Sequence, residues 1–240
     1  MTASKHVYDD LDKVLHALRQ GGFILLHDSL SRENEVDLVV AAEMVTPEHV
    51  RVMRREAGGL LCLALANQVG DKLGIANMSA IFACAASKYP VLRSLEEKKA
   101  PYGDKPAFSI SVNHRRTFTG VTDRDRAMTI SELARLSKRA LNDGIDCRQI
   151  FATEFKAPGH VHLLIESRDS LAERRGHTEL SVHLCRLARM APAAAICEML
   201  DGRTYNALSI EDAKAYAHNN SIPLLDGQQV IASFLQPRSS

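Results

Sequence analysis

The first apolar positions of the chain recur at the spacing of one helical face: Leu11, Val14, Leu15 and Leu18. A glycine pair, Gly21-Gly22, ends this pattern, and the apolar run Phe23–Leu26 follows directly. Glycine is favoured where a helix ends, and a short apolar run after such a signal is typical of a buried strand. The pattern therefore predicts a helix, a turn and a strand.

Helices and strands continue to alternate along the rest of the chain. Thr46-Pro47-Glu48 combines a capping residue, a first-turn proline and an acid, which predicts a helix that ends at Gly58-Gly59 before another apolar strand. Phe108–Asn113 alternates apolar and polar residues, as a strand with one wet face does. Further helices are predicted at 129–139, 178–190, 210–218 and 228–235, and further strands at 161–165, 193–199 and 222–225.

This mixture of elements predicts a layered fold, and the alternation at Phe108–Asn113 indicates that part of the sheet is antiparallel. We therefore predict an α+β fold with a mixed parallel and antiparallel sheet, in one domain that spans residues 1–240. No P-loop or dinucleotide-binding glycine fingerprint appears in the sequence. Lys88–Lys105, with Pro90 and Pro101 inside it and Pro106 directly after it, is the best candidate for a mobile excursion. It could close over a site, and an ordinary surface loop is the alternative.

The composition of the chain limits the kinds of molecule that it is expected to bind. The 240 residues carry a formal net charge of +1 with acids and bases interspersed, so neither nucleic acid nor an anionic membrane is expected to bind. No stretch approaches the roughly 18 apolar residues that cross a bilayer, and Met1–His6 lacks the apolar part of a signal peptide, which predicts a cytoplasmic protein. The five cysteines show no CxxC spacing, so neither a disulfide framework nor a zinc site is predicted.

An acidic segment, Arg32-Glu33-Asn34-Glu35-Val36-Asp37, places three carboxylates at alternate positions before the apolar run Leu38–Ala42. Alternate side chains of an extended segment share a face, so these carboxylates would crowd together. Their repulsion is tolerable where a cation, a cationic side chain or solvent lies among them. Both a cation site and a solvated acidic loop fit this pattern.

A second polar segment, Arg174-Arg175-Gly176-His177-Thr178-Glu179, comes just before a helical pattern at Leu180, Leu184 and Leu187. The N-terminus of a helix favours anions, and here Arg174 adds charge-assisted contacts and Thr178 adds a hydroxyl. These features predict a phosphate site at the helix start. The alternative is a plain cap, in which Thr178 caps the helix and His177 is an ordinary loop residue.

Together with three further motifs in a fixed order, these two segments resemble the 3,4-dihydroxy-2-butanone 4-phosphate synthase family of riboflavin biosynthesis. The further motifs are Gly58-Gly59-Leu60-Leu61-Cys62, Pro158-Gly159-His160-Val161 and Ile196-Cys197-Glu198. Five motifs in one order, between about Val14 and Leu225, are far more specific than any single motif. The archaeal form is most similar, since Phe118–Asp123 reads FTGVTD and no second enzymatic domain follows.

The resemblance implies that D-ribulose 5-phosphate is converted to 3,4-dihydroxy-2-butanone 4-phosphate and formate, with magnesium or manganese as the required ion. It implies that Glu33 and His177 are the metal ligands. A divalent ion held by a carboxylate and an imidazole can act as a Lewis acid on oxygens that gain negative charge. Magnesium usually keeps several waters, so a sparse protein shell is reasonable and weak binding without substrate is expected.

The resemblance also implies roles for the other motif residues. Glu198 matches an essential acid or base and His160 a catalytic histidine, whereas by sequence alone either could be purely structural. His162, two positions along, is predicted to be an uninvolved neighbour. Family members are homodimers, so a second copy is an implied partner and a source of His160. Substrate-binding positions are implied for Arg32, Glu33, Asp37, Cys62, Arg174, Arg175, Gly176, His177, Thr178 and Glu198, and more weakly for Asp28 and Thr119.

Two alternatives remain open at this point. A metal-dependent sugar-phosphate isomerase or aldolase would need the same carboxylate, imidazole and phosphate cradle, and a non-catalytic protein could bind sugar phosphates on the same fold. One position departs from the family pattern, because many relatives have glycine where this chain has Val36. A β-branched residue prefers extended backbone, so the acidic segment is predicted to be more strand-like here.

Overall fold

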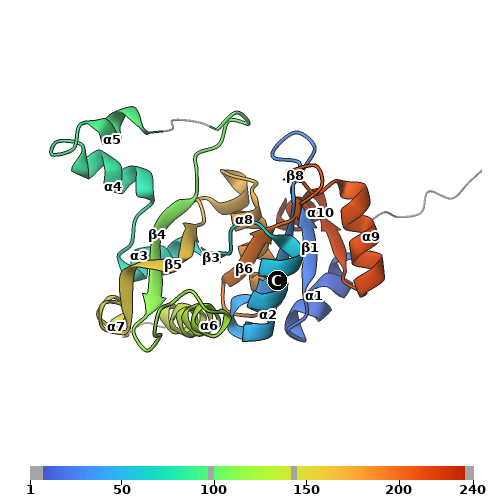
Figure 1. Cartoon of the computed structure of the whole chain (residues 1–240), viewed down its shortest axis with the longest axis horizontal. Coiled ribbons are helices and arrows are strands. Elements are labelled where there is room, and N and C mark those ends of the chain that lie inside the picture. The colour runs from blue at the N-terminus through green and yellow to red at the C-terminus, as the bar shows by residue number, and fades with distance from the viewer. Residues whose placement is uncertain (1–7, 97–99, 142–144, 236–240) are drawn as a thin grey trace, which may run out of the picture.

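The computed structural model describes residues 8–96, 100–141 and 145–235. Its larger sheet has seven strands in the order β4-β5-β3-β6-β2-β1-β9 (Figure 1). The β1–β9 and β3–β5 pairs are parallel and the other neighbouring pairs are antiparallel, which confirms the predicted α+β class. The strands are β1 (Ile24–His27), β2 (Val36–Ala41), β3 (Cys62–Leu65), β4 (Phe108–His114), β5 (Phe155–Ile165), β6 (Ala193–Glu198) and β9 (Leu224–Asp226), with a separate ribbon of β7 (Leu200–Asp201) and β8 (Asn206–Ala207).

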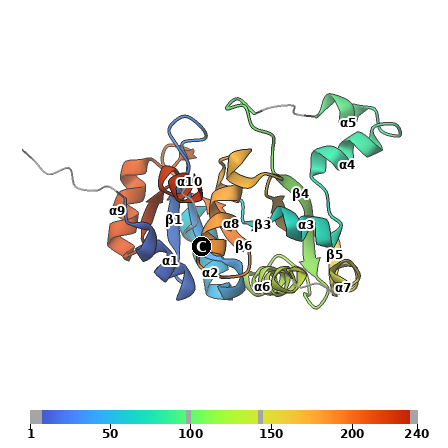
Figure 2. The same ribbon diagram turned by 180° about the vertical axis from the view of Figure 1, so that it is seen from behind.

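Helices cover both faces of this sheet (Figures 1 and 2). One group, α1, α8 and α10, packs together beside β1, β2 and β6, and the other, α2 and α6, lies against β4, β5 and β6. The α-helices are α1 (Leu11–Arg19), α2 (Pro47–Val52), α3 (Asn67–Leu73), α4 (Met78–Ala85), α5 (Val91–Ser94), α6 (Asp123–Ala140), α7 (Cys147–Glu154), α8 (His177–Leu187), α9 (Ile210–Asn220) and α10 (Gly227–Leu235). A π-helix, η2 (Met53–Ala57), extends α2, and two 3-10 turns are η1 (Ala42–Met44) and η3 (Ser170–Ala172).

The strands β1, β2 and β3 are buried along their whole length, so both of their faces are covered. Neighbouring residues of β6 show how the two faces differ. The thiol of Cys197 lies 3.8 Å from the carbonyl oxygen of Met53 in η2, whereas the adjacent Ile196 faces a cavity beside the start of α8. Because successive side chains point to opposite faces of a strand, the cavity lies on the α8 side of the sheet.

Most predicted elements are confirmed, and the differences have local causes. The helix that the Thr46 cap predicted ends where expected, because Gly58 adopts a left-handed φ of 84°. β5 begins at Phe155 and not at Val161, since an irregular register opposite Val112 accommodates Pro158 and Gly159, which read as strand breakers. No helix was predicted at α3, α4 or α7; α4 is almost uniformly apolar and so lacks the periodic signal of a helix.

All five cysteines lie in the described parts of the chain and are free, with Cys84 exposed and the other four buried. Within the same described parts, none of the helices combines the length and apolar character that crossing a membrane requires. The predicted excursion Lys88–Lys105 contains α5, and its residues 97–99, like the N-terminal residues 1–7, lie outside the described residues.

Candidate active site

The acidic segment forms the loop between β1 and β2. The carboxylate of Asp28, only 1% exposed, accepts the backbone N–H groups of Glu33 at 3.0 Å and Glu35 at 3.2 Å. Between them Asn34 has a left-handed φ of 55°. The expectation of extended backbone was therefore wrong for Glu33–Glu35, where Asp28 ties the chain into a turn, but β2 does begin at Val36, as its β-branched side chain predicted.

The second polar segment forms the start of α8. Gly176 is the N-cap, which contradicts the alternative of a cap by Thr178; Thr178 lies buried in the first turn. The buried carboxylate of Glu179 accepts the N–H of Gly176 at 3.3 Å and a guanidinium N–H of Arg174 at 2.5 Å. Glu179 therefore holds both the helix start and the Arg174 side chain in place.

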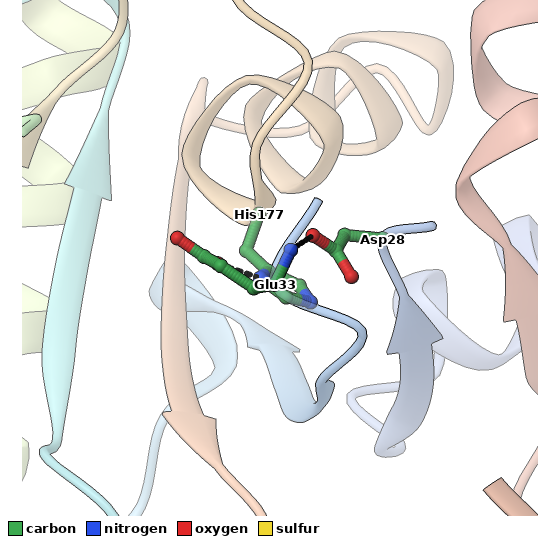
Figure 3. A group of neighbouring side chains, drawn as sticks. All are labelled: Asp28, Glu33 and His177. Atoms are coloured by element: carbon green, nitrogen blue, oxygen red, sulfur yellow. Dashed lines mark hydrogen bonds and ion pairs between the residues drawn. The ribbon is translucent and has the colours of Figure 1, made fainter. Parts of the chain in front are cut away.

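The two segments meet in space although they are far apart in sequence. The Nδ1 atom of His177 lies 3.3 Å from a carboxylate oxygen of Glu33, 144 residues away, and its Nε2 atom lies 3.7 Å from Asp37. Figure 3 shows Asp28, Glu33 and His177 together, from the end of β1, the β1–β2 loop and the start of α8. Ligand atoms of these three residues all lie within 4.8 Å of one another, a separation that one metal ion can bridge.

The donor set suits a hard divalent cation. The Nε2 atom of His177 and the Oδ1 atom of Asp37 are buried and find no hydrogen-bond partner among the described residues. Buried polar atoms are rarely left without a partner, and a cation between carboxylate and imidazole would provide one. Asp28, Glu33 and His177 are therefore the residues that could hold a divalent ion such as magnesium, while Asp37 faces the Nε2 side of the same imidazole.

The pKa values of the site residues reflect the crowding of several acids around one imidazole. Burial alone would lower the pKa of His177, but Asp37 and the hydrogen bond to Glu33 raise that pKa to about 9. Burial likewise opposes ionisation of Glu33, yet bonds from His177 and Tyr102 and the charge of Arg32 lower its pKa to about 2. Burial, reinforced by Glu198 and Glu33, raises the pKa of Asp37 to about 7. The imidazolium thus serves as the cation among the carboxylates in the metal-free protein.

A cavity of about 340 Å³ adjoins this cluster. The strand register explains part of its lining, because Asp37 pairs with Glu198 and Cys62 pairs with Ile196 across the sheet. Paired residues of neighbouring strands point to the same face, so both pairs border the cavity. Of the predicted site residues, Glu33, Asp37, Cys62, Arg174, His177, Thr178 and Glu198 line this cavity.

Two of these residues are further defined by their surroundings. Glu198, at the end of β6, accepts the backbone N–H of Leu60 at 2.8 Å, and its own carbonyl accepts the N–H of Gly59, which fixes its side chain at the cavity edge. Burial, together with Glu198 and Asp37, raises the pKa of the Cys62 thiol above its ordinary value. Cys62 is therefore a neutral lining residue and not a thiolate nucleophile.

Positive charge gathers at the start of α8. The Nη2 atom of Arg32 and the Nε atom of Arg174 are buried without a hydrogen-bond partner in the part of the chain that the structure describes. A Cβ atom at Gly176 would collide with the guanidinium groups of both arginines, so only glycine lets them converge there. These free donors next to a helix N-terminus form a site suited to a phosphate. Arg175 lies apart from that site, with its Nε directed to the Leu171 carbonyl at 3.5 Å.

Two residues of the site were not predicted from the sequence. The guanidinium of Arg32 lies 4.5 Å from the ring centre of Tyr102, and its Nε donates to Asp104 at 2.8 Å. The Tyr102 hydroxyl donates a hydrogen bond to Glu33, which helps to lower the pKa of that carboxyl. Both residues belong to the predicted excursion Lys88–Lys105, so the available signal in the sequence was the possibility that this segment closes over a site.

Six predicted site residues do not line the cavity: Asp28, Arg32, Arg175 and Gly176, described above, and His160 and Thr119. His160 is exposed on β5, where its backbone N–H donates to Asn113 at 2.9 Å and its Nδ1 atom lies 3.1 Å from the Asn113 amide nitrogen. The same Asn113 side chain packs on Gly120, which follows Thr119. His160 and the FTG turn therefore form a second cluster, separate from the Glu33–His177 cavity of the same chain. His162 pairs with Cys62 on β3, beside the cavity-lining row.

Comparison with known proteins identifies the family. Residues 12–233 match the family model for 3,4-dihydroxy-2-butanone 4-phosphate synthase. The chain belongs to this family. It is 44% identical to the 3,4-dihydroxy-2-butanone 4-phosphate synthase of Methanothermobacter thermautotrophicus, over 95% of this chain and 97% of that protein. It is 38% identical to the synthase of Archaeoglobus fulgidus, over 94% of each chain.

Solved structures of the family agree with the fold. A crystal structure of a 3,4-dihydroxy-2-butanone 4-phosphate synthase in complex with two magnesium ions matches with a TM-score of 0.74 at 30% identity, over 95% of this chain and 97% of that one. The Candida albicans synthase matches with a TM-score of 0.73 at 26% identity, over 95% and 99% of the chains. The chain is thus an enzyme, a carbon–carbon lyase of riboflavin biosynthesis, and its resemblance to the archaeal form is confirmed.

Proposed function

We propose that this enzyme converts D-ribulose 5-phosphate to 3,4-dihydroxy-2-butanone 4-phosphate and formate, in the cytoplasm and as one catalytic domain. The observation that carries the proposal is the meeting of Glu33 and His177, 3.3 Å apart, beside a cavity lined by Arg174, whose Nε atom has no hydrogen-bond partner among the described residues. A five-carbon sugar phosphate divides into the four-carbon phosphate and formic acid with no net gain or loss of atoms. No redox cofactor is therefore needed.

Phosphate binding is the role of the α8 start. Arg32 and Arg174 each keep a buried donor without a partner in the described residues, and Thr178 adds a hydroxyl in the first helical turn. The phosphate takes no part in bond breaking, so its binding energy serves to hold the reacting carbons near Glu198 and His177. Arg175 is the weakest member of the predicted cradle, because its Nε atom is directed to the carbonyl of Leu171 at 3.5 Å.

Metal binding is the role of Glu33 and His177, with Asp28 close enough to join them. A divalent ion bound there, magnesium or manganese, would supply Lewis acidity to the carbonyl and hydroxyl oxygens of the sugar. His177 must lose its proton to become a ligand, and Glu33 is already ionised at neutral pH.

Proton transfer is the role of Glu198. Its carboxylate borders the cavity and, within the part of the chain that the structure describes, accepts one backbone N–H, from Leu60 through Oε2. The other oxygen, Oε1, is therefore available to a substrate hydroxyl or carbon acid. Cys62, Phe108, Leu164 and Ile196 form an apolar wall around the same space. Such a wall limits water around reactive enediol species.

The second cluster is the expected contribution of another copy of the chain. His160 and Thr119 lie outside the cavity of their own chain, yet both match family positions that act on substrate. A homodimer that brings His160 and Thr119 of one copy to the cavity of the other would complete the site. The exposed Phe118 and Val121 beside Thr119 supply apolar surface for such a contact.

The purified protein should be incubated with D-ribulose 5-phosphate and magnesium, and formate followed by proton NMR. Formate appearing in equal amount to the four-carbon phosphate supports the proposal. A pentose phosphate isomer without formate would instead indicate an isomerase, and a triose with a two-carbon fragment an aldolase. Bound but unchanged sugar phosphate would indicate a binding protein.

A further inference from the structure

A buried histidine outside the cavity contacts the acidic loop. His27 is the last residue of β1 and is 3% exposed. Its Nε2 atom lies 3.1 Å from the side-chain oxygen of Asn34, and its Nδ1 atom lies 3.1 Å from the hydroxyl of Tyr8. Neither His27 nor Tyr8 lines the cavity. The hydrogen-bonding capacity of this imidazole is therefore used entirely within the protein.

The three side chains form a directed chain of hydrogen bonds. An amide oxygen only accepts, so the Nε2–H of His27 donates to Asn34. The Nδ1 atom of that tautomer is an acceptor, and the Tyr8 hydroxyl donates to it. The Tyr8 and His27 rings are also nearly parallel, with an interplanar angle of 6° and centroids 6.2 Å apart. Tyr8 thus fixes both the tautomer and the orientation of the imidazole.

Tyr8 is itself held by its neighbour Asp9. The backbone N–H of Asp9 donates to the carbonyl of Leu224 at 2.8 Å, and the Asp9 carboxylate accepts the N–H of Leu224 at 3.0 Å. The side chain of Gln229, in α10, donates to the Asp9 carbonyl at 3.2 Å. This end of the hydrogen-bond chain is therefore anchored on β9 and α10.

At the other end, Asn34 forms the corner of the acidic loop. Its φ of 55° is a left-handed conformation that side-chain-bearing residues adopt rarely, although asparagine tolerates it better than most. The residues on either side, Glu33 and Glu35, direct their N–H groups to the same Asp28 carboxylate. Asp28 holds the loop through its backbone, and His27 holds it through the Asn34 side chain. The corner turns Glu33 toward His177.

We propose that Tyr8, His27 and Asn34 form a positioning device that keeps the acidic loop in the conformation in which Glu33 meets His177. The proposal rests on the proposed function, because it assigns Glu33 to the metal. Among the described residues, neither Tyr8 nor His27 lines the cavity or hydrogen-bonds to Glu33, so they act on the reaction through the position of the loop. Residues that orient metal ligands from outside the ligand set commonly change metal affinity about 10- to 100-fold when they are replaced.

The test is His27→Phe, which keeps a ring against Tyr8 and removes both hydrogen bonds. We expect the dissociation constant for Mn²⁺, measured alone from the electron paramagnetic resonance signal of the free ion, to rise about tenfold. Tyr8→Phe, which removes one hydroxyl, should also raise the dissociation constant for Mn²⁺, but by a smaller factor. At saturating Mn²⁺, kcat for formate release should return close to the wild-type value, because the chemistry itself uses neither residue.

Asn34→Gly supplies the coupling test. Glycine adopts the left-handed corner without a side chain for His27 to hold, so His27→Phe should change Mn²⁺ affinity by less than about twofold in that background. The matched control is His16→Phe on the exposed side of α1, which should leave affinity unchanged.

Wild-type affinity in His27→Phe, or losses that add fully in the double variant, would overturn the proposal. If His27→Phe does not fold, wild-type affinity in Tyr8→Phe would overturn it. If the wild-type protein binds no Mn²⁺ and releases no formate, the proposed function itself is wrong. If the wild-type protein binds Mn²⁺ and releases formate, and His27→Phe has the same Mn²⁺ affinity, only the positioning role is wrong.

Discussion

At the scale of single residues, the carboxylate of Glu33 is contacted by several other side chains of the site. His177, Arg32 and Tyr102 all reach its carboxylate, from α8, from the same loop and from the segment before β4. Glu33 is therefore ionised over the whole physiological range, since these donors outweigh its burial. A metal ion can replace the imidazolium proton there while Arg32 and Tyr102 stay in place.

The hydroxyl of Tyr102 should contribute to this arrangement. Tyr102→Phe removes the hydrogen bond to Glu33 and leaves the ring over Arg32, so we expect kcat/KM for formate release to fall about tenfold, as for a lost bond to a charged group. The control is Tyr89→Phe, in an exposed position before α5, which should behave like the wild type. Equal activity in Tyr102→Phe and the wild type would exclude a role for the hydroxyl.

Metal binding should depend on pH through His177. Its pKa is raised to about 9 in the metal-free protein, so below that pH the metal must displace a proton to bind. The apparent Mn²⁺ affinity should therefore rise with pH, by about tenfold per unit between pH 7 and 8.5, and level off above pH 9. Below pH 7 the slope should steepen further as Asp37 becomes protonated. Calorimetric titrations in two buffers of different ionisation enthalpy would count the released protons, and pH-independent affinity with no proton release would contradict this.

The free energy of unfolding of the metal-free protein should fall as pH rises, whereas the Mn²⁺ affinity rises. A raised imidazole pKa stabilises the folded state fully below the unfolded value of about 6.5, and that stabilisation is lost as pH rises through about 9.

At the scale of elements, the start of α8 combines a helix N-terminus with two guanidinium groups that only glycine allows to approach. Gly176→Ala should therefore displace Arg174 and Arg32 while leaving the rest of α8 intact. We expect KM for D-ribulose 5-phosphate to rise about tenfold or more, with a smaller change in kcat, because phosphate binding is remote from bond breaking. Steady-state kinetics of this variant beside Gly202→Ala, where a Cβ meets nothing, would measure the effect. A fall in kcat with an unchanged KM would argue against a phosphate site there.

The elements also show what the sequence could and could not predict. β2, β6 and α8 were predictable, because apolar runs and helical spacing are local signals. The turn at Asn34 was missed, since it depends on Asp28 accepting two N–H groups across the loop. Tyr102 and Asp104 were missed for a similar reason: their partners, Arg32 and Glu33, are about seventy residues away, and nothing local marks the contact. The pairing of Glu33 with His177 was reached only through the family resemblance.

At the scale of the whole molecule, His160 lies apart from the Glu33–His177 cavity of its own chain. This separation allows a test of whether each active site takes residues from two copies of the chain. Two inactive variants, Glu33→Gln and His160→Ala, should restore activity when mixed under conditions that exchange subunits. If each site takes Glu33 from one copy and His160 from the other, a mixed dimer has one intact site. An equal mixture should then recover about one quarter of wild-type formate release. No recovery after confirmed exchange would mean that both residues act within one chain.

The most direct measurement of the central claim is the electron spin echo modulation of Mn²⁺ bound to the protein. If Glu33 and His177 hold one ion, the wild-type spectrum contains a nitrogen coupling from a single imidazole, and this coupling changes on ¹⁵N-histidine labelling. The coupling should be absent in His177→Gln, and Glu33→Gln should bind Mn²⁺ at least about tenfold more weakly. A nitrogen coupling that survives in His177→Gln, or unchanged affinity in Glu33→Gln, would contradict a shared ion between these two residues.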